Sequence, residues 1–185
     1  ENDLTAFRAY GPALQETGER AFGYDIWTKY NTTEPVVEAR YEGELNPDMK
    51  AKIAELGKTD PKAAQELYRS VSYHVDHGNG LDCYKVGPTL GGGTTALMAG
   101  DTIVYPYCYA TQEILDNGPL RFTVKLVYNP LVVKGDSTII ETRIITLDAG
   151  SYCNKTVVSY TNLKETMPLA VGIVLHEPDG AIVAD

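Results

Sequence analysis

The sequence has little of what marks a disulfide scaffold, a membrane span or a nucleic-acid surface. Its three cysteines, Cys83, Cys108 and Cys153, lack CxxC spacing and predict unpaired, mostly buried thiols rather than a disulfide framework or a zinc ribbon. No apolar run reaches the roughly 18–20 residues that span a bilayer, so membrane insertion is not expected. The formal net charge of -9 argues against a surface that binds nucleic-acid phosphates.

Length and composition favour one globular domain. A chain of 185 residues that is 43% hydrophobic can bury a core of its own, which predicts a single domain over residues 1–185. The chain begins at Glu1 without a methionine and stops just after the strand-like run 181–183. We therefore expect it to be part of a longer polypeptide.

Short runs rich in Thr, Val, Ile and Tyr dominate the second half of the chain, with turn residues between them. This alternation is typical of antiparallel hairpins. Asn117 and Gly118 or Lys134 and Gly135 supply turn chemistry between the runs. The pattern predicts a mainly β fold of antiparallel hairpins and a meander, with strands at 6–10, 24–30, 102–109, 120–128, 138–147, 152–160 and 169–175.

One helical insertion is predicted near residues 47–69. Asn46 is a good cap, and Pro47 fits the first helical position. Asp60 and Pro61 repeat the same start signal.

The segment 73–82 concentrates the reactive side chains and holds two of the three histidines. Three interpretations compete. A histidine oriented by a carboxylate can act as a general acid or base. Alternatively, His74, Asp76 and His77, joined by His176, can bind a divalent metal, although no familiar zinc spacing is present. In the third interpretation the imidazoles only cap backbone groups of a glycine-rich loop.

Two further features suggest ligand contacts. The glycine run 91–93 lacks the lysine of a phosphate-binding loop and predicts a flexible loop instead. Tyr105, Tyr107 and Tyr109 alternate along one predicted strand, so they would share a face on which sugar rings stack. The alternative is that these rings only fill the face of a sheet.

These motifs together resemble the DUF4861 family. The resemblance rests on residues 7–12, on 73–87 with its His-x-Asp-His-Gly motif, on the glycine run, and on 117–119 and 147–151. Members are secreted or periplasmic proteins, chiefly of Bacteroidota, often encoded beside genes for the breakdown of uronic-acid-rich polysaccharides. The resemblance implies a periplasmic or extracellular location and a β-sandwich similar to the galactose mutarotase supersandwich, of which this chain would form a part.

The polar segment and the resemblance lead to one hypothesis: a carbohydrate-active protein that acts on uronic-acid-containing oligosaccharides or polysaccharides by β-elimination, as a lyase or dehydratase without a cofactor. Such chemistry needs a base, an acid for the leaving group and a cation for the carboxylate. The expected catalytic residues are His74, His77, Asp76 and Tyr84, and the expected substrate-binding residues are Arg8, Tyr73, Asp82, Lys85, Tyr105 and Tyr107.

Two alternatives stay open at this point. A mutarotase or epimerase would use the same parts with an Asp or Glu as base. A non-catalytic carbohydrate-binding or structural module would use the tyrosines as a platform and the polar segment as a hydrogen-bonding rim.

Overall fold

The computed structural model describes residues 1–30 and 34–176, which form two compact units interleaved along the chain. The first unit comprises Glu1–Phe7, Ile26–Cys83 and Leu147–Asn154, and the second comprises Arg8–Asp25, Tyr84–Thr146 and the residues from Lys155 onward. Antiparallel sheets dominate, which confirms the mainly β prediction. The strand predicted at 181–183 lies outside the described residues, and the single domain over 1–185 stays a prediction.

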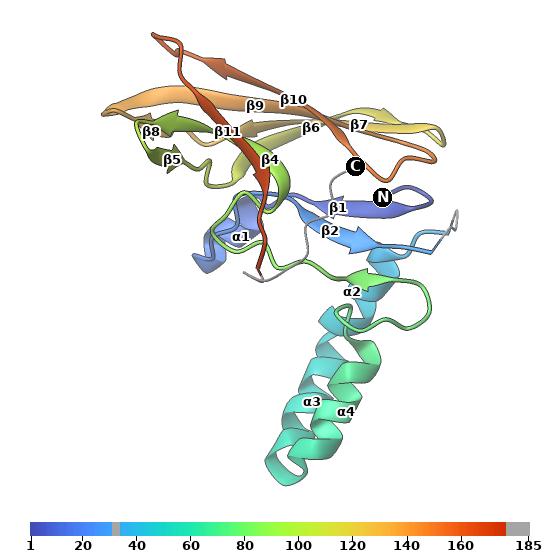
Figure 1. Ribbon diagram of the computed structural model, residues 1–185. Coiled ribbons are helices and arrows are strands. Elements are labelled where there is room, and N and C mark those ends of the chain that lie inside the picture. The colour runs from blue at the N-terminus through green and yellow to red at the C-terminus, as the bar shows by residue number, and fades with distance from the viewer. Residues whose placement is uncertain (31–33, 177–185) are drawn as a thin grey trace. The chain divides into compact units, whose positions relative to one another are not determined.

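The first unit combines a small sheet with a helical arm (Figure 1). The sheet has the order β1-β2-β3, with β1 at Thr5–Arg8, β2 at Asp25–Thr28 and β3 at Leu81–Asp82. Three helices follow β2: α2 (Val37–Leu45), α3 (Pro47–Thr59) and α4 (Pro61–Val71). Within the described chain, no helix is both long and apolar enough to cross a membrane.

Both predicted helix starts are confirmed. The side chain of Asn46 accepts hydrogen bonds from the backbone N–H groups of Asp48 and Met49, each at 3.0 Å. Asp60 likewise accepts from Ala63 N–H at 3.0 Å. These bonds satisfy N–H groups that have no partner inside the helix. The helical region is longer than predicted because α2 begins at Val37, where no side chain caps the helix.

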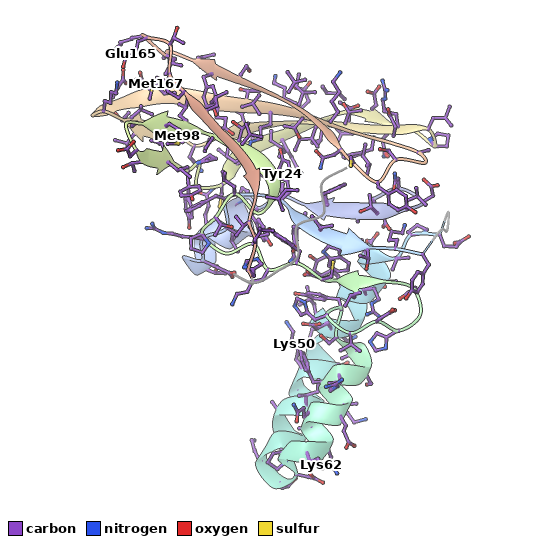
Figure 2. All side chains as sticks on the ribbon, in the orientation of Figure 1. Tyr24, Lys50, Lys62, Met98, Glu165 and Met167 are labelled. Atoms are coloured by element: carbon purple, nitrogen blue, oxygen red, sulfur yellow. The ribbon has the colours of Figure 1, made fainter. Side chains whose placement is uncertain are left out.

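Replacing Asn46 with alanine is expected to lower the stability of the helical arm by about 1 kcal/mol, because two backbone donors lose their acceptor. Hydrogen exchange of the first turn of α3 measures this loss. Lys50→Ala and Lys62→Ala, at exposed positions of the same arm (Figure 2), are matched controls that should change stability by less than about 0.5 kcal/mol. Equal losses in all three variants would contradict the capping role.

The second unit contains a short helix, α1 (Pro12–Thr17), and two antiparallel sheets. The larger sheet has the order β10-β9-β7-β6, with β8 also paired to β9. The smaller sheet has the order β11-β4-β5. The strands are β4 (Gly92–Ala99), β5 (Thr102–Val104), β6 (Tyr109–Asn117), β7 (Arg121–Tyr128), β8 (Leu131–Val133), β9 (Asp136–Asp148), β10 (Lys155–Thr161) and β11 (Leu169–Ile173).

The core of the second unit lies between these two sheets. Leu97 of the smaller sheet packs with Leu131, Val133 and Ile139 of the larger one, and all four are almost fully buried. Each such side chain contributes roughly 1.5–3 kcal/mol through burial of apolar surface. Two antiparallel sheets that share an apolar layer form a β-sandwich, as predicted.

Two local predictions are wrong. The glycine run is not a flexible loop, because Gly92 begins β4. Gly91 forms a β-bridge with Tyr24, and a Cβ atom added to Gly91 would lie 2.6 Å from the Tyr24 carbonyl oxygen. The strand predicted at 102–109 ends at Val104, and a new strand starts only at Tyr109. Pro106 lies in the gap and cannot donate to a strand ladder.

Candidate functional site

The polar segment lies in the first unit, where residues 72–80 connect α4 to β3. Helix α2 holds the start of this loop. Glu44 accepts a hydrogen bond from the Tyr73 N–H at 2.8 Å, and Arg40 donates to the carbonyl oxygen of Ser72 at 3.0 Å and to that of Val75. Because Arg40 and Glu44 are four residues apart, they share one face of α2. Side chains of helix α2 therefore hold the backbone of the loop in place.

The His74 ring contacts the backbone carbonyl of Asp82, with the Asp82 carboxylate nearby. Its Nδ1 lies 3.3 Å from the backbone carbonyl oxygen of Asp82 and 3.7 Å from Asp82 Oδ2. A carbonyl oxygen only accepts hydrogen bonds, so this contact assigns the proton of neutral His74 to Nδ1 and leaves Nε2 as the basic nitrogen. The His74 side chain is 53% exposed, whereas that of Asp82 is 1% exposed. A solvent-facing imidazole whose Nδ1 faces a carbonyl oxygen has the chemistry to exchange a proton through Nε2.

Aromatic rings support His74 from the side. The Tyr73 ring packs on the His74 ring with centroids 4.5 Å apart. Tyr73 in turn contacts Trp27 and Tyr41, at 5.2 and 5.1 Å between centroids. Trp27 is buried in β2 directly opposite Asp82 of β3. Pairing of β2 with β3 therefore sets both the carboxylate and the aromatic support of His74.

Asp76 and His77 are engaged with the backbone and with Tyr30. Asp76 accepts hydrogen bonds from the N–H groups of Gly78 and Gly80, at 2.8 and 3.3 Å, and from the Tyr30 hydroxyl. The Tyr30 hydrogen bond, followed by that of Gly78, lowers the pKa of Asp76. His77 Nε2 lies 3.1 Å from the Ser72 carbonyl oxygen, to which it donates. Both side chains thus stabilise the turn, and the contact of His77 is the one that the third interpretation of the sequence expects.

The geometry offers little to a metal ion. Among residues 1–30 and 34–176, no three histidine, cysteine, aspartate or glutamate side chains gather into a group that could hold one. His74, Asp76 and His77 contact Asp82, Tyr30 and Ser72 respectively. The divalent-metal alternative therefore has no ligand cluster in the described chain.

Arg8 and Tyr84 belong to the second unit, where both are already engaged. Arg8 forms an ion pair with the buried carboxylate of Asp25. The Tyr84 hydroxyl lies 2.5 Å from the Val174 carbonyl oxygen and 3.0 Å from that of Gly91, which share its one proton, and burial raises the pKa of Tyr84. These contacts hold the strand ends together, so a transferable proton on Tyr84 would require breaking them.

The remaining residues predicted in the second unit differ in exposure. Lys85 is exposed, and the ring of His176 packs on Tyr84 with centroids 5.3 Å apart.

Tyr105 and Tyr107 do not share a strand face, because the strand stops before Pro106. Tyr105 stacks on Phe22 at 4.9 Å, and the Tyr107 hydroxyl donates to the Glu19 carbonyl at 3.1 Å. The predicted tyrosine platform is therefore wrong as a strand face.

The cysteines differ from the prediction as well. Cys108 is buried, but Cys83 and Cys153 are exposed, so the thiols are not mostly buried. Cys83 follows Asp82 directly, and its sulfur contacts the Ile26 carbonyl oxygen at 3.5 Å.

Sequence reasoning missed the residues that hold the loop: Arg40, Glu44, Trp27, Tyr41 and Tyr30. The first two lie on α2, which has no capping signal, although their i, i+4 spacing was a usable hint. The aromatic residues reach the loop through tertiary packing, which no local pattern shows.

Comparison with known proteins gives a family but no activity. The chain is 28% identical over 189 residues to "Uncharacterized protein P7" of Formosa agariphila. The aligned region covers 98% of this chain and 41% of that protein. The chain thus spans less than half the length of this relative. No solved structure matches. The family described as "Domain of unknown function (DUF4861)" matches residues 1–184, and the chain belongs to it.

Proposed function

We propose that this chain is part of a carbohydrate-active protein that acts on uronic-acid-containing oligosaccharides by β-elimination, with His74 as the base. The observation that carries the proposal is the half-exposed His74 imidazole, whose Nδ1 donates to the backbone carbonyl of Asp82 and lies 3.7 Å from the buried Asp82 carboxylate, with Nε2 as the basic nitrogen. Tyr73 supports the ring from the side.

In the proposed step, Nε2 removes the proton from the carbon next to the sugar carboxylate. The electron pair of that C–H bond forms a C=C bond, the C–O bond to the leaving group breaks, and the leaving oxygen takes up a proton. Asp82 stabilises the imidazolium that forms. Tyr73 is the tyrosine in contact with His74 and is our candidate acid. Carboxylate binding by Arg8 or Lys85, acid catalysis by Tyr84 and a periplasmic or extracellular location stay predictions.

The test is turnover of uronic oligosaccharides by the whole protein, followed through the ultraviolet absorbance of the new conjugated double bond. His74→Gln is expected to lower kcat about 100-fold or more, the usual contribution of a general base. His77→Gln keeps a donor for the Ser72 carbonyl and is expected to cost only about two- to threefold. A large loss in His77→Gln with an active His74→Gln would reject His74 as the base.

A non-catalytic carbohydrate-binding role is the second candidate, favoured by the backbone-capping roles of Asp76 and His77. It predicts saturable oligosaccharide binding by the parent protein without any product. A mutarotase-like activity, in contrast, would interconvert sugar anomers or epimers without forming a double bond.

A further inference from the structure

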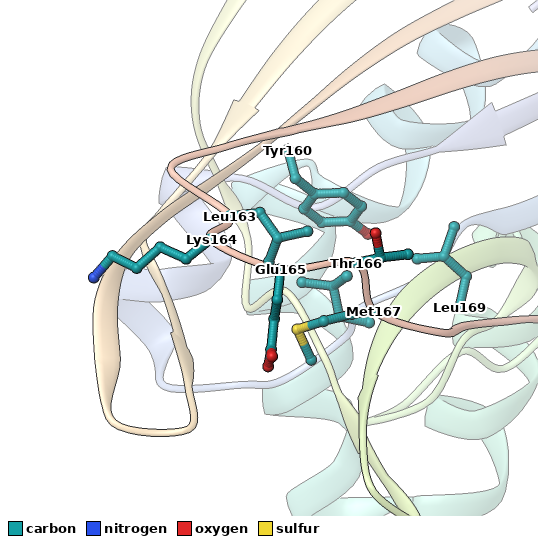
Figure 3. A pocket seen from close by; sticks show the side chains of 8 residues that line it. Tyr160, Leu163, Lys164, Glu165, Thr166, Met167 and Leu169 are labelled. Atoms are coloured by element: carbon teal, nitrogen blue, oxygen red, sulfur yellow. The ribbon is translucent and has the colours of Figure 1, made fainter.

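A pocket of about 640 Å³ opens in the second unit beside the segment 162–168, which joins β10 to β11 (Figure 3). This volume falls within the usual range of small-molecule sites, about 300–1,000 Å³. None of the residues of the proposed acid–base site lines this pocket. The lining residues are Leu97, Tyr160, Leu163, Lys164, Glu165, Thr166, Met167 and Leu169.

The wall of the pocket is continuous with the sandwich core. Leu97 belongs to the buried core cluster, and Tyr160, Leu163 and Met167 pack against that cluster. The pocket is therefore a place where the apolar layer between the sheets reaches the surface. A tyrosine ring and a methionine thioether in one wall favour contact with an aromatic ring.

The charges at the rim are already neutralised. Glu165 accepts from Lys134 at 2.5 Å, and Lys164 pairs with Asp136 at 2.7 Å. Both partners lie at the turn between β8 and β9, and Asn162 adds a hydrogen bond to the Thr138 carbonyl at 2.8 Å. These contacts clasp the segment 162–168 to the hairpin. Because each rim charge has its counter-ion, a charged ligand would gain little there.

The inner side of the pocket is also electrically neutral. Burial, followed by the nearby Glu141 carboxylate, raises the pKa of the Tyr160 phenol, so this hydroxyl stays protonated at neutral pH. The carboxylate of Glu141 itself is ion-paired with Arg143. The wall therefore presents an uncharged ring and aliphatic groups to a ligand.

We propose that this pocket binds a small neutral ligand through an aromatic ring, held between Tyr160 and Met167, with the clasped segment 162–168 as its outer wall. Thr166 also lines the pocket, and its hydroxyl is our candidate partner for a polar substituent of that ring. The size, the apolar wall and the balanced rim charges all select this class of ligand over a charged one.

The experiment titrates the purified protein with N-phenyl-1-naphthylamine, a neutral aromatic probe that fluoresces in apolar surroundings. Leu169→Asp puts a charge into the pocket wall and is expected to weaken binding by about tenfold or more. Val171→Asp is the matched control. Leu169 and Val171 lie on the same face of β11 and are 51% and 78% exposed, but only Leu169 lines the pocket.

We expect Val171→Asp to bind the probe within about twofold of the parent protein. Met167→Trp, which puts a bulkier ring into the pocket, should weaken the saturable signal while the unfolding midpoint stays near that of the parent. Three results would overturn the proposal: no saturable binding by the parent, parent-like binding by Leu169→Asp, or equal losses in both aspartate variants. The last would place the probe on the exposed apolar row of β11.

Discussion

Arg143→Met is expected to lower the free energy of unfolding by about 3–5 kcal/mol, because it leaves the carboxylate of Glu141 buried without its partner. Both side chains are fully buried, and Arg143 Nε lies 2.5 Å from Glu141 Oε1. The two residues are two positions apart on β9, so they point to the same side of the sheet. Urea-induced unfolding of the parent and the variant measures the loss.

The surroundings of Arg143 favour its cationic form. Its guanidinium lies over the ring of Tyr128 at 4.4 Å and that of Tyr24 at 5.3 Å, which are cation–π contacts. Burial lowers the pKa of Arg143, but Tyr128, Tyr24 and Glu141 raise it by more, so the net shift is upward. In the variant, Glu141 loses this counter-charge in a water-poor interior.

The double variant Glu141→Leu with Arg143→Met is the control. Replacing both members of a buried ion pair by apolar side chains is often neutral or stabilising. We therefore expect the double variant to recover most of the stability that Arg143→Met loses. A double variant as unstable as the single one would show that packing of the arginine stem, and not the unpaired charge, causes the loss.

Lowering the pH provides a second check on Arg143→Met. An unpaired buried carboxylate has a folded-state pKa above its unfolded value, so the folded variant binds more protons than the unfolded chain. The difference in free energy of unfolding between the parent and Arg143→Met should therefore shrink as the pH falls toward the ordinary carboxyl range of about 4.

Local sequence signals predicted those parts of the fold that depend on neighbouring residues. Asn46–Pro47 and Asp60–Pro61 predicted two helix starts because capping is a contact within one turn. The runs at 120–128 and 138–147 predicted strands because they are rich in Thr, Val, Ile and Tyr and are bounded by turn residues. The glycines at the start of β4 gave no such pattern, since β4 pairs with the distant β11. The polar, exposed β6 also gave none, although it forms a hairpin with the neighbouring β7. Pro106 was a local warning against a strand over 102–109.

The same limit applies to the candidate site. Spacing placed His74, Asp76, His77 and Asp82 in one segment, but it left open which carboxylate orients which histidine. Pairing of β2 with β3 places Asp82 beside His74, where the Asp82 backbone carbonyl contacts Nδ1, and it leaves Asp76 in a turn. The support from Arg40 and Glu44 comes from α2, which the sequence did not predict.

Gly80→Ala is expected to destabilise the first unit strongly, because two separate penalties act at this position. Gly80 has φ +98°, where a side chain costs about 1–3 kcal/mol in backbone strain. An added Cβ would also lie 1.9 Å from the Thr28 carbonyl oxygen, and relieving such overlap typically costs another 1–3 kcal/mol or so. Thr28 is paired with Leu81, so β3 must move away from β2 and carry Asp82 with it.

Gly78→Ala separates the two penalties. Gly78 has a similar φ of +91°, but nothing lies within 4 Å of the Cβ it would gain. It should therefore show only the strain, about 1–3 kcal/mol by urea unfolding, and should keep His74 beside Asp82. Gly80→Ala should lose more stability and, in addition, any turnover that depends on His74. If the two variants were equally stable and equally active, close approach of β2 to Gly80 would not be what positions the His74–Asp82 pair.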